Sequence, residues 1–341
     1  MQGIAFLGDR KIGKLAFPDP VVGQGEVILE MKASGICGTD LKFYRDPHGP
    51  DAAPFIGGHE PCGVVAELGP GVDRERVKVG DRVMVHHYTG CGWCEHCRSG
   101  WAQLCERAPV KIYGGNTHGG HAKYLKVPAA TLVPLPAELS FEAGAAISCG
   151  TGTAYSALRR LRLSGGDTIA IFGQGPVGLA ATQFAAAMGA RVIALDISPE
   201  RLRRAGEFGA DSLINPADGD ALAEIKKLTR GRGADLALDT SGSQQGANSA
   251  VRSTRIWGSV CLIAGPGPLN LNITSDLTHR QTTIIGVWTF SIAGQMECAR
   301  FVAERGIDVD RVFTHTWNLD QAEEAYRLTD GQGAGKGVFL L

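Results

Sequence analysis

The pattern of apolar and polar residues changes near residue 150 of the chain. Before that point, runs such as "EVILEMK" and "DRVMVHH" are apolar or alternate over strand lengths, and Gly and Pro separate them. After it, apolar runs of strand length alternate with stretches of helical character. The change predicts a β-rich region followed by an α/β region.

The second region holds six short apolar runs with helical stretches between most of them. This arrangement predicts a parallel sheet covered on both faces by helices. The last fifty residues add a helix candidate, "QMECARFVAERG", and a short apolar end, "GKGVFLL". The six strand candidates are "DTIAIFG", "ARVIALD", "DSLIN", "ADLALDTSG", "GSVCLIAG" and "TTIIGVW".

Length and composition indicate an ordinary globular protein of about two domains. The chain has 341 residues, of which 44% are hydrophobic, and a length of about 150 residues per domain is typical. Its 34 Lys+Arg and 35 Asp+Glu give a formal charge of −1, without a long basic cluster, so neither nucleic acid nor an anionic membrane is an expected partner. The start lacks the apolar run of a signal peptide, and we expect a cytoplasmic protein without membrane spans.

A glycine-rich turn follows the first strand of the α/β region. It runs Gly173-Gln174-Gly175-Pro176-Val177-Gly178 and opens a helix, and the next strand ends in Asp196. The first glycine permits a tight turn, the second lets backbone amides approach a pyrophosphate, and the third lets helix and strand pack closely. An acidic side chain at the end of the next strand accepts hydrogen bonds from the ribose and repels a 2′-phosphate.

These residues favour NAD over NADP, with Arg201 as a further contact to the ribose. Arg203 and Arg204 leave NADP open, because arginines near this position can accommodate a 2′-phosphate. A glycine turn that merely packs a nucleotide-free sheet is the other interpretation.

Four cysteines, Cys91, Cys94, Cys97 and Cys105, lie within the short segment "GCGWCEHCRSGWAQLCE". In a reducing compartment, clustered thiols are more often metal ligands or redox groups than disulfides. Two disulfides among such close neighbours would be strained, and the surroundings do not resemble a thioredoxin-like unit. Four thiolates leave no open coordination position, which predicts a structural zinc, with an iron–sulfur cluster as the alternative.

Three other segments hold further metal-ligand types: Cys37 in "GICGTD", His59-Glu60 in "GGHEP" and Cys149 in "ISCGTGTAY". Each residue alone has a simpler explanation as a buried thiol or a core histidine. Together, two cysteines and one histidine would leave a fourth position open to water or substrate, which is typical of a catalytic zinc.

The chain resembles the zinc-dependent medium-chain dehydrogenases. The resemblance rests on "GICGTD", "GGHEPCGVVAELGPGV", "VGDRV", the four-cysteine segment, "ISCGTGTAY" and "FGQGPVGLAATQFAAAMGARVIALD", and it runs from about residue 25 to the C-terminus. It implies a GroES-like catalytic domain made of residues 1–150 and 289–341, with a structural zinc lobe at about 90–106. A Rossmann NAD-binding domain at 151–288 would be inserted into it.

The resemblance also implies residue roles. Cys37, His59 and Cys149 match the catalytic zinc ligands, Glu60 a carboxylate beside the metal, and Asp40 the partner that fixes the ligand histidine. The positions that match contacts to the substrate or cofactor are Thr39 for the substrate oxygen, and Thr153 and Lys336 for the cofactor. The family also suggests two zincs per chain and a homo-oligomer, either a tetramer or a dimer.

Two positions depart from common members of this family. Many alcohol-oxidising members carry a relay histidine five residues after the first ligand, where this chain has Lys42. A lysine ammonium is a poor proton shuttle at neutral pH, so His48 or solvent could replace it. Polyol and threonine dehydrogenases often have a glutamate in place of Cys149. By analogy, the substrate pocket could include Phe55, His87, Tyr88 and Trp288.

We therefore expect a zinc-dependent oxidoreductase that transfers a hydride between a small alcohol or polyol and NAD. One alternative is an NADPH-dependent carbonyl or enone reductase of the same fold. The other is a non-catalytic, metal-stabilised nucleotide-binding protein. The substrate itself is not identified by the sequence, because a fold does not specify which alcohol enters the site.

Overall fold

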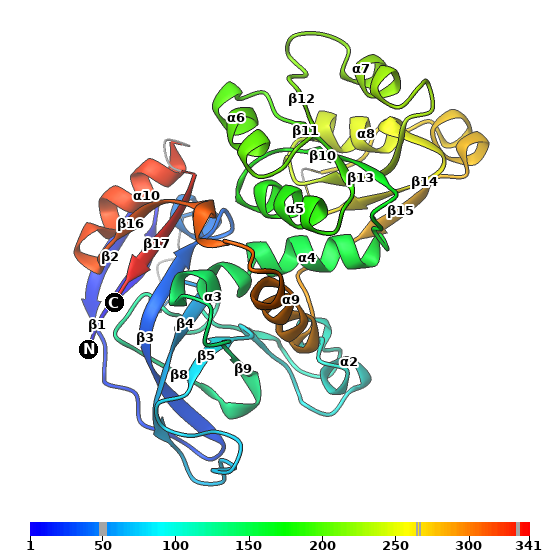
Figure 1. Cartoon of the computed structure of the whole chain (residues 1–341). Helices are drawn as coiled ribbons and strands as arrows, with labels where there is room; N and C mark the ends of the chain where they lie inside the picture. Colours follow the sequence, from blue (N-terminus) through cyan, green and yellow to red (C-terminus); the bar gives the residue numbers. More distant parts are fainter. Residues whose placement is uncertain (48–52, 264, 266, 332–334) are drawn as a thin grey trace. The chain divides into compact units, whose positions relative to one another are not determined.

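The computed structural model describes the chain except for residues 48–52, 264, 266 and 332–334. It divides into two compact units (Figure 1). The first comprises Met1–Gly152 and Phe290–Leu341, and the second is the continuous segment Thr153–Thr289. The first unit is thus assembled from both parts of the chain that flank the second.

The first unit is built on a seven-stranded sheet that combines residues distant in sequence. Strand β3 lies near its middle and pairs antiparallel with β4, β8 and β17, so the last strand of the chain is an inner strand of this sheet. In spatial order the strands are β16 (Phe313–Trp317), β17 (Lys336–Leu340), β3 (Glu26–Ile36), β4 (Glu60–Leu68), β5 (Arg82–Val85) and β9 (Leu132–Pro134), with β8 (Tyr124–Pro128) also paired to β3.

An aromatic core holds the two ends of the first unit together. Phe6 of β1 (Gln2–Gly8) packs edge-on against Tyr326 of α10 (Ala322–Asp330), with ring centroids 5.3 Å apart. Phe339 of β17 belongs to the same buried cluster. Burial of each such ring stabilises the fold by about 1.5–3 kcal/mol, so the N-terminal and C-terminal segments depend on each other.

Smaller elements complete the first unit. Strand β1 pairs with β2 (Lys11–Ala16), and β6 (Tyr88–Thr89) pairs with β7 (Lys111–Ile112) beside the cysteine-rich segment. The remaining helices used below are α1 (Asp40–Arg45), α2 (Glu95–Arg98), α3 (Phe141–Ile147) and α9 (Ile292–Arg305).

The second unit contains the six-stranded parallel sheet that the apolar runs predict. Its strand order reverses between β10 and β13, which is the topological switch point of a dinucleotide-binding sheet. In spatial order the strands are β12 (Ser212–Ile214), β11 (Arg191–Leu195), β10 (Thr168–Phe172), β13 (Ala234–Asp239), β14 (Thr254–Leu262) and β15 (Thr283–Gly286).

Helices cover both faces of this sheet, as the pattern predicts. Consecutive residues of a strand face opposite sides, and Ala194 of β11 packs with α5 (Pro176–Ala187) and α6 (Pro199–Glu207). Its neighbours Ile193 and Leu195 belong to the other core, with α7 (Ala221–Leu228) and α8 (Gln244–Ser253). The α/β fold class expected from the sequence is confirmed.

No helix in the described part of the chain has the length and apolar character that a bilayer crossing requires.

Candidate functional site

Four possible metal ligands meet in the first unit. Cys37 follows β3, His59 and Glu60 lie at the start of β4, and Cys149 lies between α3 and α4 (Gly150–Arg160). Their ligand atoms all lie within 4.8 Å of one another, and His59, Glu60 and Cys149 are buried. The structure thus brings together the three segments that the sequence singled out.

Asp40 fixes the orientation of His59. Its Oδ1 lies 2.7 Å from His59 Nδ1, and its Oδ2 accepts the backbone N–H of Cys37 at 2.8 Å. When Nδ1–H of His59 donates to the carboxylate, the lone pair of the neutral ring lies on Nε2. This tautomer can bind a metal through Nε2. The same carboxylate therefore orders two of the candidate ligand residues.

The ionisation of the cluster suits a cation. The Cys149 thiol, by hydrogen bonding, lowers the pKa of Cys37 well below its usual value. Burial disfavours a charged imidazole, but Asp40 and the Cys37 sulfur raise the pKa of His59 well above its usual value. The Cys37 thiolate and the His59 imidazolium therefore stabilise each other's charged form, and a metal ion can take the place of the imidazolium proton beside the thiolate.

Glu60 and Lys336 form a fully buried ion pair next to this cluster. The Lys336 ammonium contacts Glu60 Oε2 and donates to the backbone oxygen of Ile36 at 3.2 Å. Burial raises the pKa of Glu60, and Lys336 opposes that shift. Glu60 Oε1 has no hydrogen-bond partner among the described residues, which leaves one oxygen available at the cluster.

The donor set therefore fits a zinc ion. Zinc commonly binds cysteine sulfur at about 2.3 Å and histidine nitrogen at about 2.0–2.1 Å, so its ligand atoms lie about 3.3–3.8 Å apart. The two thiols and the imidazole lie within 4.8 Å of one another. A tetrahedral zinc bound to these three groups keeps a fourth position for an oxygen ligand.

The other residues predicted for the substrate site lie in different surroundings. Thr39 is exposed at the start of α1, and its hydroxyl makes no capping hydrogen bond. His87 lies against His59 with ring centroids 5.2 Å apart, and its Nδ1 is 2.9 Å from the backbone oxygen of Ser148. Phe55 instead packs against the core rings of Phe6 and Phe43.

The structure also describes three further candidates. Tyr88 is buried and lines a separate cavity in the first unit. Trp288 belongs to the second unit and is 54% exposed. Lys42 is exposed on α1, and His48 lies outside the described residues.

The four cysteines of the segment at 90–106 also meet in space. Their sulfur atoms lie within 4.8 Å of one another, and both Cys91–Cys97 and Cys94–Cys105 have sulfur–sulfur distances of 4.0 Å. A disulfide requires about 2.05 Å. A tetrahedral zinc–thiolate site gives about 3.8 Å between sulfurs, so the spacing fits a metal.

Backbone N–H groups support negative charge on these sulfurs. The amide of Cys91 donates to Cys105 Sγ at 3.3 Å, and this contact lowers the pKa of Cys105 to about 6. Gly90 is required beside them, because a Cβ there would come within 2.6 Å of Cys105 Cβ and 2.7 Å of Cys97 Sγ. This cluster is closed, whereas the cluster around His59 leaves a position open.

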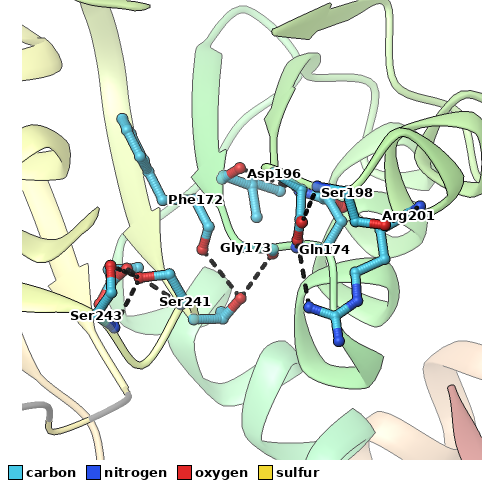
Figure 2. A network of polar contacts seen from close by, with 11 residues as sticks. Phe172, Gly173, Gln174, Asp196, Ser198, Arg201, Ser241 and Ser243 are labelled. Atoms are coloured by element: carbon cyan, nitrogen blue, oxygen red, sulfur yellow. Dashed lines mark hydrogen bonds and ion pairs between the residues drawn. The ribbon is translucent and has the colours of Figure 1, made fainter. Parts of the chain in front are cut away.

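The glycine turn of the second unit has the features that its sequence predicts (Figure 2). Gly173 has φ +87°, and a Cβ on Gly178 would lie 1.9 Å from the Gly173 oxygen, so turn and helix are in close contact. A Cβ on Gly175 would meet no atom within 4 Å, and α5 begins at the next residue, Pro176. The turn thus leaves open space at the N-terminus of α5, followed by Val177 in its first turn, where a pyrophosphate fits.

Asp196 anchors the glycine turn through its carboxylate. One oxygen accepts the backbone N–H of Gln174 at 2.7 Å and the other that of Ser198 at 2.8 Å, and Arg201 Nη1 lies 3.8 Å away (Figure 2). A carboxylate has about four acceptor sites, so capacity for ribose hydroxyls remains. Thr153, the remaining cofactor candidate, is buried in α4 at the start of the second unit.

The side chain of Gln174 was not singled out by the sequence. It is fully buried, donates to the Ile171 oxygen at 3.0 Å and accepts from Thr182 at 2.9 Å. It thereby ties the glycine turn to β10 and α5. In the sequence, the position of Gln174 between two glycines was the only signal that could have indicated this role.

Comparisons with known proteins agree with this architecture. The family model of the alcohol dehydrogenase GroES-like domain matches residues 23–137, and that of the zinc-binding dehydrogenases matches residues 176–305. The chain belongs to the zinc-dependent medium-chain dehydrogenase family.

Relatives match nearly the whole chain. The zinc-type alcohol dehydrogenase-like protein YphC of Escherichia coli K12 is 40% identical, over 96% of this chain and 94% of its own length. An alcohol dehydrogenase of Geobacillus stearothermophilus is 38% identical over 94% of each chain. A sorbitol dehydrogenase of Bacillus subtilis is 33% identical over 95% of this chain and 92% of its own.

Solved structures share the fold. The alcohol dehydrogenase TADH of Thermus sp. ATN1 superimposes with a TM-score of 0.91 at 28% identity, covering 100% of this chain and 99% of its own. An alcohol dehydrogenase (rspB) of E. coli CFT073, solved with NADH, has a TM-score of 0.89 at 25% identity, with the same coverage.

Proposed function

We propose that this protein is a zinc-dependent dehydrogenase that transfers a hydride between a small alcohol or polyol and NAD, giving the ketone or aldehyde. The observation that carries the proposal is the cluster of the half-buried Cys37 with the buried His59 and Cys149, a ligand set that leaves a fourth position open. Relatives that are named alcohol and sorbitol dehydrogenases over more than nine-tenths of the chain support this substrate class.

Cys37, His59 and Cys149 would hold the zinc. When bound, zinc in such a site acts as a Lewis acid that polarises the substrate oxygen. Asp40 accepts a hydrogen bond from Nδ1–H of His59, which leaves Nε2 as the nitrogen that would bind the metal. Lys336 balances the charge of Glu60, so that this carboxylate does not stand as an isolated negative charge in a buried site.

Thr39 would accept the proton of the substrate hydroxyl. Its hydroxyl is exposed, lies two residues from Cys37 and is not used as a helix cap. Beyond Thr39, Lys42 is exposed on the same helix and can hydrogen-bond a ribose hydroxyl. Because a lysine ammonium releases protons poorly at neutral pH, solvent is the more effective final acceptor.

The turn Gly173–Gly178 and the N-terminus of α5 would bind the pyrophosphate, with Asp196 and Arg201 at the adenosine ribose. Thr153 and Lys336 would complete the cofactor contacts. When bound, the nicotinamide of NAD accepts the hydride at C4. The position of Asp196 favours NAD, because its carboxylate repels a 2′-phosphate.

We also propose that the protein forms a homo-oligomer. In the described sheet of the second unit, β15 is an edge strand whose Ile284 is 38% exposed. An apolar side chain on an unpaired edge favours pairing with another copy.

The deciding experiment is the zinc content per chain of wild type and Cys149→Ala, together with NAD and NADP reduction against a panel of alcohols and polyols. We expect about two zincs in wild type, about one in the variant, and loss of turnover with an unchanged circular dichroism spectrum. Cys261→Ala is the matched control, because Cys261 is also a buried cysteine and lies in β14, outside both cysteine clusters.

Two results would reject this proposal. Full zinc content in Cys149→Ala would remove the assignment of the open metal site. Turnover of carbonyl compounds with NADPH alone would favour the reductase alternative over alcohol oxidation with NAD.

A further inference from the structure

The candidate ligand Cys149 lies at the junction of two helices rather than inside one. Helix α3 ends directly before Ser148, and α4 begins directly after Cys149. Asp40 orders the other two candidate ligands, Cys37 and His59. A tetrahedral metal site also requires its third ligand at a fixed position, so the contacts that hold this junction decide the geometry of the cluster.

Ser148 connects the junction to α3, β4 and α9. It is fully buried, and its hydroxyl lies 2.9 Å from the backbone oxygen of Gly144 in α3 and 3.2 Å from that of Pro61 in β4. The hydroxyl also accepts a hydrogen bond from Nε2 of Gln295 in α9 at 3.3 Å. Pro61 is two residues after His59, so this serine joins the segments of two candidate ligands.

His87 holds the same serine from a further segment. Its Nδ1 lies 2.9 Å from the backbone oxygen of Ser148, and this contact is buried. A carbonyl oxygen only accepts hydrogen bonds, so Nδ1 carries the hydrogen and donates it. The His87 ring also packs against the ring of His59, with centroids 5.2 Å apart. One side chain therefore contacts His59 itself and the residue next to Cys149.

Close packing fixes the helix that leads into this junction. A Cβ on Gly144 would lie 2.4 Å from Cys62 Sγ and 2.9 Å from Leu135 Cδ1, so α3 contacts the sheet directly at this glycine. Cys62 belongs to β4, the strand that begins with Glu60. Because protein interiors are close-packed, α3 and Ser148 keep a defined position against this strand.

We propose that Ser148 and His87 are positioning residues for the open metal site. They set the place of Cys149 relative to His59, and neither belongs to the four candidate ligands found among the described residues. Their role rests on the proposed function, because it concerns the zinc that those ligands would hold. Partners of this kind typically change the affinity of a site for its metal by about 10–100-fold.

His87→Phe keeps a ring against His59 and removes the hydrogen bond to the Ser148 oxygen. We expect it to bind zinc at the open site about 10–100-fold more weakly than wild type. His87→Asn should restore most of the affinity, because its side-chain N–H can take the place of Nδ1–H and donate to the same oxygen. Packing alone predicts the reverse order, because phenylalanine fills the space of the imidazole more fully than asparagine does.

Ser148→Ala tests the hydroxyl and should weaken zinc binding at the same site about tenfold. Ser253→Ala is the matched control, because Ser253 is also a buried serine whose hydroxyl donates to a backbone oxygen of the preceding helical turn, at 2.8 Å. It lies in α8 of the second unit, so its zinc affinity should equal that of wild type.

Chelator titration of the zinc-loaded full chain, followed by elemental analysis, measures these affinities, and circular dichroism shows which variants fold. The four-cysteine cluster provides an internal control. Its zinc should resist the chelator equally in Cys149→Ala and in Cys149→Ala combined with His87→Phe, because the second substitution acts only through Cys149.

Two results would overturn the role of Ser148 and His87 alone. One is zinc in His87→Phe and Ser148→Ala that resists the chelator as in wild type. The other is weaker zinc binding in His87→Asn than in His87→Phe. If His87→Phe does not fold, Ser148→Ala and its control decide the question. A single zinc in wild type would instead reject the open metal site of the proposed function, and the positioning role with it.

Discussion

Asp40 and His59 form a fully buried pair in which carboxylate Oδ1 and ring Nδ1 are 2.7 Å apart. The other Asp40 oxygen holds the backbone of Cys37. One side chain therefore connects the turn after β3 to the start of β4 and orders the two candidate ligands on those segments.

Asp40→Asn should weaken zinc binding at this site by about 10–100-fold, because an amide neither fixes the His59 tautomer nor adds charge. Chelator titration of the zinc-loaded protein, followed by elemental analysis, measures the change. Asp46→Asn is the control, since Asp46 is exposed at the end of α1. Equal chelator resistance of the two variants would contradict the assigned role of Asp40.

Gly175→Ala should weaken NAD binding at least tenfold without destabilising the free protein. The added methyl meets nothing within 4 Å in the chain itself, but it would occupy the space through which the pyrophosphate of the proposed cofactor approaches. Calorimetric titration with NAD measures the loss of binding, and a thermal melt measures the stability of the free protein. Gly166→Ala, also with open space, is the matched control and should bind NAD normally.

Gly178→Ala should reduce stability by contrast, because its Cβ would lie 1.9 Å from the backbone oxygen of Gly173. Relief of this clash requires helix α5 to move, at a cost of about 1–3 kcal/mol in the free energy of unfolding. Urea unfolding measures the change. A variant as stable as wild type would show that turn and helix separate easily.

Cys105→Ser should remove one zinc per chain and expose the segment at 90–106 to proteases. Only the short helix α2 and one 3₁₀ turn are regular there, so a zinc bound by the four cysteines would supply much of the order of this segment. Zinc analysis and limited proteolysis would detect both effects. Ser99→Ala, a hydroxyl in the same segment, is the control and should keep two zincs.

Asp276 should contribute stability that depends on pH. Hydrogen bonding to Arg252, at 3.0 Å, lowers the pKa of Asp276 below its usual value. A lowered carboxylate pKa means that this stabilisation is present above about pH 4 and is lost as pH falls through the folded-state value. Asp276→Asn should therefore cost on the order of 1 kcal/mol at pH 7.

Urea unfolding at a series of pH values between 7 and 3 should show this difference from wild type decreasing at the acid end. Asp218→Asn, an exposed residue of the same unit, provides the comparison and should show a small, constant difference. If the loss of unfolding free energy in Asp276→Asn increased on acidification, the prediction would be wrong.

The sequence predicted the second unit well because its signals are local. Each strand is a continuous apolar run, and the glycine turn of residues 173–178 directly follows one of them. Helix α10 was not predicted, although Ala322, Ala325 and Tyr326 are buried at helical spacing. Its apolar positions are few, so periodicity alone gave a weak signal.

The structure brings the candidate metal ligands together, but some contacts of the candidate site residues could not be predicted from the sequence. Lys336 was expected near the cofactor, and the structure shows its ammonium against Glu60, 276 residues away in sequence. The surroundings of the buried His86 could not be predicted for a similar reason. Its surroundings come from α9 and the cysteine-rich segment, which no local pattern connects.

The inner position of β17 has a consequence for synthesis of the chain. Lys336 and Ile36 are neighbours although 300 residues separate them, whereas the second unit is one continuous segment. On the ribosome, the second unit can therefore complete its sheet while the first still lacks β16 and β17. The nascent protein leaves residues 33–36 of β3 without their β17 partner during this interval, and we expect chaperones to bind and aggregation to begin there.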